Sequence, residues 1–170
     1  MPPGQPTIIV HHPRPYDIVH NPVHVAGYST AFEGTVIVRL RDGNDQVIKQ
    51  TFFTGGANGV YAAFRVNVGL QHEPVTRNGF LEVYEESAKD GSPIGMVRRP
   101  IVYGIALLHE YRGYRLHTVA SGDTLSQLAK NEYGDASLWP VIHAANAHDV
   151  PDPDLIDIGQ VLRIPQGLAP

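Results

Sequence analysis

The chain has 170 residues, of which 42% are hydrophobic and 18% charged, with a net charge of −4 and no cysteine. This composition can bury a core, and it excludes a mainly disordered chain, disulfide bonds, thiolate metal sites and thiol catalysis. The acidic balance argues against nucleic-acid binding, and no apolar run approaches the roughly 18 residues that a membrane span needs.

The first fifteen residues, "MPPGQPTIIVHHPRP", lack a basic start followed by an apolar stretch. A secretory signal needs both features, so we expect no signal peptide within them. The total length fits one ordinary domain or two small ones.

The first hundred residues alternate between apolar and polar side chains. Val36, Val38 and Leu40 alternate with Arg39 and Arg41, which is typical of a half-buried strand. Turn-forming runs rich in Gly, Asp and Asn separate such stretches. About seven strands are predicted, near residues 7–11, 22–27, 35–41, 46–53, 60–68, 79–86 and 94–103. This spacing predicts an all-β immunoglobulin-like sandwich over residues 1–104.

Acidic residues of this region offer no catalytic pair. Glu85 and Glu86 are adjacent on a strand, so they point to opposite faces and cannot flank one glycosidic bond. Glu33, before the strand at 35–41, is interpreted as a bend residue that accepts backbone N–H groups.

Beyond residue 113 the pattern changes to strand, helix, helix, strand. A strand at 114–119 leads into the helical run "DTLSQLAKNEYG", then into "SLWPVIHAANA", and "QVLRIP" closes the segment as a strand. We expect a small α+β module over residues 114–166, preceded by a linker at 105–113. The apolar residues just before Arg112 predict that this linker packs against the rest of the chain.

Ser121 lies beside Gly122 and Asp123, so it raises the question of a serine nucleophile. A nucleophile needs a base and an orienting group within hydrogen-bond reach, and no spacing supplies them here. Asp123 or Thr124 is the natural N-cap of the helix that follows, and Thr124 with Gln127 fits a capping box. The sequence therefore predicts a helix start, and the protein is expected not to be an enzyme.

The nine histidines do not form a ligand pattern. His20 and His24 are four apart, but on a strand this spacing separates them by about 13 Å. We predict no metal site and no cofactor.

The segment from Tyr114 to Pro165 resembles the lysin motif (LysM). The resemblance rests on "YRLHTVASGDTLSQLA", on Asn146 and on "DLIDIGQVLRIP". It implies binding of N-acetylglucosamine polymers in a shallow groove between two loops. The implied glycan-binding residues are Gly122, Asp123, Thr124 and Leu125 in the first loop, and Asn146, Pro153, Asp154, Leu155 and Ile156 in the second.

The residue types of the two loops suit a neutral sugar. An acetamide-bearing sugar needs backbone groups, short polar side chains and an apolar spot for its methyl group. Leu125, Leu155 and Ile156 supply apolar surface, and Gly122 lets a sugar approach the backbone. Two other interpretations stay open: Leu125 and Ile156 as plain core residues, and Asp123 as only a cap.

Residues 21–43, 59–68 and 79–93 resemble the immunoglobulin-like domain associated with bacterial spore germination, the second Gmad type. The resemblance rests on the stretches "NPVHVAGYSTAFEGTVIVRLRDG", "GVYAAFRVNV" and "GFLEVYEESAKDGSP". The resemblance implies an extracytoplasmic sandwich without established chemistry, which acts as a spacer or a protein-binding domain.

We therefore expect a non-catalytic protein of the bacterial cell wall or spore envelope that binds peptidoglycan or a chitin-like oligomer. A second hypothesis follows from "YGDASLW" and "NAHDVPDPDL", which resemble a LysM variant of intracellular and phage-like injection assemblies. In that hypothesis both domains bind proteins, and the chain is a structural adaptor in such an assembly or in a spore-coat-like layer.

Overall fold

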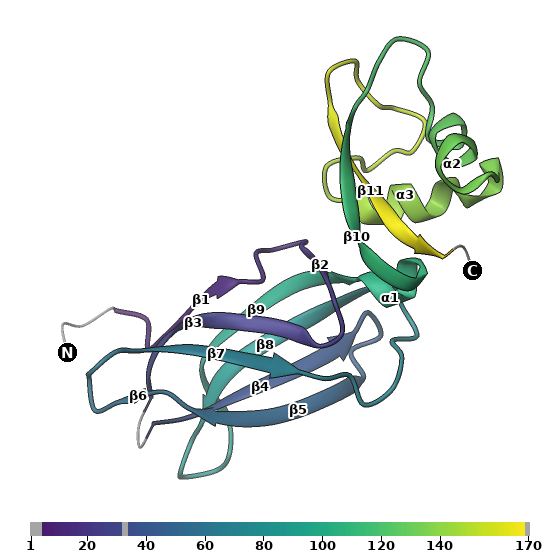
Figure 1. The fold of residues 1–170 in the computed structure, drawn as a ribbon. Helices are drawn as coiled ribbons and strands as arrows, with labels where there is room; N and C mark the ends of the chain where they lie inside the picture. The colour runs from purple at the N-terminus through teal and green to yellow at the C-terminus, as the bar shows by residue number, and fades with distance from the viewer. Residues whose placement is uncertain (1–4, 32–33, 169–170) are drawn as a thin grey trace.

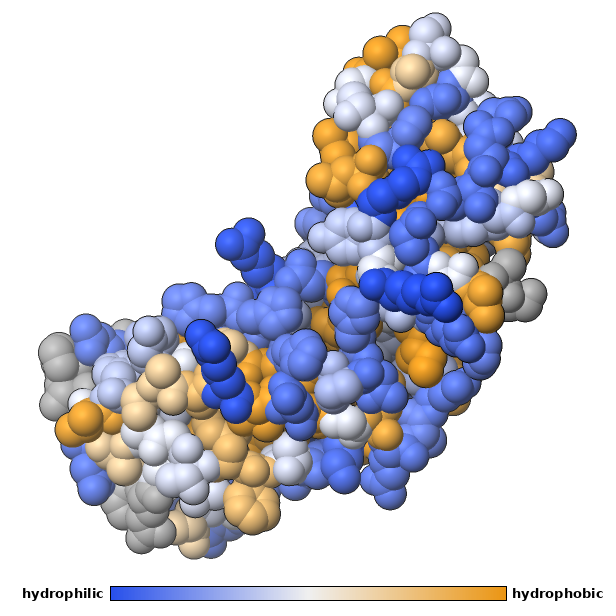
Figure 2. Space-filling model, viewed as in Figure 1, coloured by the Kyte–Doolittle hydropathy of each residue, from blue (hydrophilic) through white to orange (hydrophobic). Residues whose placement is uncertain are grey.

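The computed structural model describes residues 5–31 and 34–168, and shows a strand-rich N-terminal part joined to a part with helices (Figure 1). The short helix α1 (Gly104–Leu107) lies between them. The interpretation of Glu33 falls outside the described residues. Figure 2 shows the elongated, bent shape that results.

The N-terminal part contains two facing sheets. One has the strand order β2 (Ile18–Val19), β9 (Pro93–Tyr103), β8 (Asn78–Glu86), β4 (Thr35–Asp42) and β5 (Val47–Thr54). The other is built around β3 (Val23–Ala31), which pairs with β1 (Ile8–His12), β7 (Ala62–Val68) and β6 (Gly56–Ala57). All seven predicted strands are present. The two missed strands, β2 and β6, have only two residues each, too few to show an alternating pattern.

The core of this part lies between the sheets. Val36, Val38 and Leu40 are fully buried there, as their alternation predicts. β7 differs at its start, because the strand begins at Ala62 and leaves Val60 70% exposed in the preceding turn.

Glu82 and Tyr84 are buried although they alternate with the core residues of β8. An arginine network covers them on the outer face of the sheet. The register places Glu82 between Arg39 of β4 and Arg98 of β9. Three guanidinium groups surround the Glu82 carboxylate, from Arg41 at 3.0 Å, Arg98 at 3.5 Å and Arg39 at 3.6 Å.

This network also positions an aromatic side chain near the helices. The Arg98 guanidinium lies over the ring of Phe80, 4.0 Å from its centroid. Phe80 stands two residues before Glu82 on the same face of β8. The buried carboxylate therefore fixes, through Arg98, a ring at the end of the sheet that faces the C-terminal part.

The C-terminal part follows the predicted order of strand, helix, helix and strand. β10 (His109–Thr118) pairs antiparallel with β11 (Val161–Leu168). Between them lie α2 (Leu125–Tyr133), a 3-10 turn η2 (Ala136–Leu138) and α3 (Trp139–Asn146). β10 begins five residues before the predicted strand, because its first residues still pair with the end of β11.

α2 begins and ends at the residues that its capping signals, Thr124 and Gly134, indicate. Thr124 is the N-cap and its hydroxyl accepts from the backbone N–H of Gln127 at 3.1 Å. The Gln127 side chain donates forward to Asn131, so only half of the predicted capping box forms. Gly134 ends the helix in the left-handed conformation, with a φ of 77°. No helix in the described ranges is long and apolar enough to cross a membrane.

An apolar cluster holds the two parts together. Leu107 and Leu108, from the segment predicted as a linker, pack with Val102 of β9 and with Val141 and Ala145 of α3. This confirms that the segment packs against the rest of the chain.

Two polar contacts flank the apolar cluster. The rings of Tyr16 and His148 stack with centroids 3.7 Å apart, and Arg163 of β11 donates to the Tyr16 carbonyl at 2.7 Å. A strand of the C-terminal part and a loop of the N-terminal part are thus hydrogen-bonded directly.

We expect Glu82→Gln to lower the free energy of unfolding by roughly 3 kcal/mol, because it leaves three guanidinium groups around a buried neutral amide. Chemical denaturation followed by far-UV circular dichroism measures this change. Glu86→Gln, at an exposed position of the same strand, is the matched control and should change the value by less than about 0.5 kcal/mol. Equal effects of the two substitutions would contradict the role assigned to the network.

Candidate functional site

The first loop of the site connects β10 to α2. Gly122 adopts a φ of 90°, and a side chain added there would meet nothing within 4 Å. The backbone is therefore open to a ligand at this position, while its conformation favours glycine. Gly122 allows the chain to turn from the strand into the cap at Thr124.

Asp123 fastens this loop to the strand before it. Its Oδ2 accepts from the backbone N–H of Ala120 at 2.9 Å and lies 2.7 Å from Nε2 of His117. These hydrogen bonds, chiefly the one from Ala120 and then the one from His117, hold the pKa of Asp123 below its usual range. Asp123 is therefore ionised at neutral pH, and it closes the turn while Thr124 caps the helix.

The second loop runs from residue 147 to residue 160 and is braced by its own polar side chains. Asp152 accepts from the backbone N–H of Asp154 at 3.0 Å, and Gln160 accepts from that of Asp157 at 3.1 Å. Gly159 donates to the carbonyl of Val119 at 2.8 Å, and Val119 donates to that of Gln160 at 2.9 Å. The two loops are therefore hydrogen-bonded to each other at their base.

A cavity of about 310 Å³ opens between the two loops. Its walls come from the first loop and the start of α2, from the start of α3, and from the second loop. The lining residues are Asp123, Thr124, Leu125, Ser126, Trp139, Pro153, Asp154 and Ile156.

Six of the nine predicted site residues line this cavity. They are Asp123, Thr124, Leu125, Pro153, Asp154 and Ile156. Gly122 and Leu155 belong to the same loops but do not line the cavity, and Leu155 is 72% exposed.

Asn146 is the predicted site residue that lies elsewhere. It is 2% exposed, and its amide donates to the carbonyls of Ile142 and Arg163 and accepts from the backbone N–H of Arg163. Two of these bonds, both of 2.8 Å, join the end of α3 to β11, and the third, of 2.7 Å, lies within α3. Asn146 does not line the cavity, and the structure gives its side chain a supporting role between α3 and β11. Its contact with a ligand stays a prediction.

Ser126 and Trp139 line the cavity and were not among the predicted site residues. Ser126 is exposed on the first turn of α2, where it follows the predicted loop directly. Trp139 is half-buried at the start of α3 and packs against the core of the C-terminal part. The only tryptophan of the chain is a usable signal, since its indole ring combines apolar surface with one N–H donor.

The cavity combines the features that bind a neutral, polar ligand with small apolar groups. Leu125, Ile156 and Trp139 supply apolar wall, and the first two also belong to the hydrophobic core or pack against it. Thr124, Ser126 and Asp154 supply exposed hydroxyl and carboxylate groups at its edge. Among the described residues, no group of His, Asp and Glu is arranged to hold a metal ion.

Comparison with protein families identifies both parts of the chain in the expected order. Residues 7–92 match the family described as the Gmad2 immunoglobulin-like domain of bacterial spore germination. Residues 117–165 match the LysM domain, which contains both loops of the cavity. A LysM domain indicates binding of N-acetylglucosamine-containing glycan and an extracytoplasmic, wall-associated setting.

Similar curated proteins share a short stretch of this chain. The esterase Rv1288 of Mycobacterium tuberculosis is 58% identical over 48 residues, which cover 28% of this chain and 10% of the esterase. The potassium binding protein Kbp of Escherichia coli is 50% identical over 52 residues, 31% of this chain and 35% of that protein. The chain thus spans about a third or less of these relatives. No solved structure matches it significantly.

We expect Asn146→Ala to lower the free energy of unfolding of the C-terminal part by roughly 3 kcal/mol, because it removes the partner of the Arg163 N–H and of the Arg163 carbonyl. Thermal unfolding followed by Trp139 fluorescence reports on this part. Asn131→Ala, at an exposed position of α2, is the matched control and should be nearly neutral. A stable Asn146→Ala variant would show that the amide does not hold α3 to β11.

Asp123 should stabilise the protein only when it is ionised. Because its pKa is lower in the folded chain, its contribution is present above the pKa of the unfolded carboxyl, near 3.9, and is lost as the pH falls through the folded value. Asp123→Asn should therefore lower the melting temperature at pH 7, and its difference from wild type should shrink as the pH falls through the folded pKa of Asp123. A difference that is constant from pH 7 to pH 2.5 would contradict this role.

Proposed function

We propose that the chain, which belongs to the Gmad2 family of immunoglobulin-like domains of bacterial spore germination, is a non-catalytic envelope protein that binds N-acetylglucosamine-containing glycan. Residues 114–166 form the glycan-binding domain. Residues 1–104 form a separate sandwich domain that acts as a spacer or binds a protein, and residues 105–113 connect the two.

The main support for this proposal is the cavity between the two loops. An N-acetylated sugar presents hydroxyl groups, an amide and a methyl group, and binds where backbone groups and short polar side chains surround an apolar patch. Leu125, Ile156 and Trp139 form that patch, and the first loop exposes backbone at Gly122. The site matches the LysM segment, for which glycan binding is the expected activity.

A non-catalytic role is supported by the carboxylates of the cavity. Glycoside hydrolysis needs one carboxylic acid with a raised pKa, so that it can protonate the leaving oxygen. The pKa of Asp123 is lowered instead, and its Oδ2 is engaged by His117 and Ala120. Asp123 is therefore suited to holding the loop and unsuited to general acid catalysis.

We further propose that the protein acts at the cell wall or spore envelope, with peptidoglycan as its natural ligand and chitin oligomers as chemical mimics. The cavity is open and small, so one site should bind with modest affinity.

Co-sedimentation of the full chain with insoluble peptidoglycan and with chitin tests the proposal. Ser126→Trp should abolish pelleting, because Ser126 is exposed and lines the cavity, so a bulky side chain there fills it without disturbing the core. Gln127→Trp, at the next exposed position of α2 and outside the cavity lining, should pellet like wild type.

Titration of wild type with soluble N-acetylglucosamine oligomers should also change the fluorescence of Trp139, whose ring lines the cavity. The proposal fails if folded wild type neither pellets nor responds, or if Ser126→Trp and Gln127→Trp pellet equally well.

A further inference from the structure

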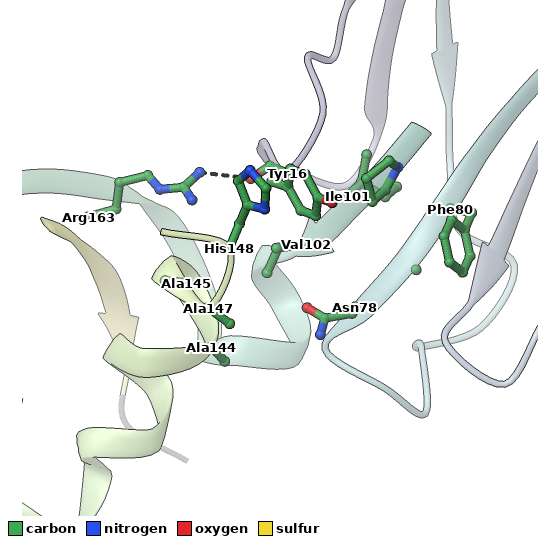
Figure 3. A pocket seen from close by; sticks show the side chains of 12 residues that line it. Tyr16, Asn78, Phe80, Ile101, Val102, Ala144, Ala145, Ala147, His148 and Arg163 are labelled. Atoms are coloured by element: carbon green, nitrogen blue, oxygen red, sulfur yellow. Dashed lines mark hydrogen bonds between the residues drawn. The ribbon is translucent and has the colours of Figure 1, made fainter. Parts of the chain in front are cut away.

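A second hollow lies at the junction of the N-terminal and C-terminal parts. A cavity of about 430 Å³ and an open cleft of about 970 Å³ share the residues Asn78, Phe80, Ala144 and Ala147. We call the two together the junction cleft. Figure 3 shows its inner end, where Asn78 and Phe80 from β8 lie across from the alanines of α3.

Half-buried residues of α3 line both the cavity between the two loops and the junction cleft. Trp139 lines the glycan cavity, and His143, one turn later, lines the junction cleft. Their ring centroids are 6.1 Å apart. Ala147 lies one further turn along, so one stripe of α3 runs for about 12 Å from one site to the other.

Part of the wall of the junction cleft is small and apolar. Ala144 of α3 and Ala147, which directly follows the helix, line the same cleft as Pro74 and Val75 of the 73–80 segment. Val75 is 80% exposed. Such a space accepts methyl-sized side chains, and the alanines leave room for a main chain to lie against the helix.

Charges of both signs stand at the rim. Glu73 and Arg77 are exposed and line the same cleft, and no ion pair of either side chain is found within residues 5–31 and 34–168. The Asn78 side chain adds amide donors and acceptors between them and α3. A neutral glycan makes no use of the two charges, whereas a ligand with carboxylates and an amine uses both.

The geometry points to the junction cleft as a binding site for the short peptide that branches from the glycan of the bacterial wall. This inference rests on the proposed glycan site. With the sugar between the two loops, the peptide follows α3 into the cleft. Its methyl side chains lie against Ala144, Ala147 and Val75, its carboxylate meets Arg77, and its amine meets Glu73. The sandwich is then part of the binding site.

The test compares two probes on the full chain by isothermal titration calorimetry. One is a tetrasaccharide of alternating N-acetylglucosamine and N-acetylmuramic acid without peptides, with its lactyl carboxyl groups converted to neutral amides. The other is the same tetrasaccharide with its peptides on those carboxyl groups. Wild type should bind the peptide-bearing probe about tenfold more tightly, the gain expected of a hydrogen-bonded charge pair. Arg77→Gln should remove that gain and leave binding of the peptide-free probe unchanged.

Arg65→Gln is the matched control, because Arg65 is equally exposed but lies on β7 and does not line the cleft. It should keep the full gain. Equal affinity of wild type for the two probes would overturn this inference and leave the glycan site standing. Tighter binding of longer peptide-free chains that depends on Arg77 would overturn it in favour of a glycan in the cleft. No binding of either probe would overturn the proposed function as well.

Discussion

The packing of the C-terminal part depends on the hydrogen bonds between the Asn146 side chain and the backbone of Arg163. A module of two strands and two short helices has little core, so its elements must be held by specific bonds as well as by burial. Asn146 joins the last turn of α3 to the backbone of Arg163 in β11 through donors and an acceptor on one side chain. Because α3 carries Trp139 and β11 follows the second loop, this bond sets the spacing of the cavity walls.

Arg163 also connects the cavity between the two loops to the junction of the N-terminal and C-terminal parts. Asn146 fixes the main chain of Arg163, and the Arg163 side chain donates to the carbonyl of Tyr16 in the N-terminal part. Tyr16 in turn stacks on His148, two residues after Asn146. The end of α3, β11 and the loop before β2 therefore form one polar unit around the apolar contacts of Leu107 and Leu108.

Local sequence patterns predicted the strands and the start of α2. They could not predict the cavity and the junction, because these form between residues that are distant in the sequence. Alternation at Val36, Val38 and Leu40 predicted β4 and its buried face, and the cap at Thr124 predicted the start of α2.

Asn146 illustrates the limit of this approach. The LysM resemblance implied that Asn146 meets a ligand, but its side chain bonds to Arg163, which lies 17 residues away in the chain. Ser126 and Trp139 were missed for a related reason, since their place in the wall becomes visible only when α2 and α3 pack together.

The direct continuation of β9 into α1 and β10 has a mechanical consequence. A module held on a wall polymer and a sandwich held elsewhere would transmit tension along this single path of the chain. β9 is hydrogen-bonded along most of its length to β8 and at its end to β2, so such a load would shear many bonds together. The strand pairing of β9 would therefore oppose a pull along this connection.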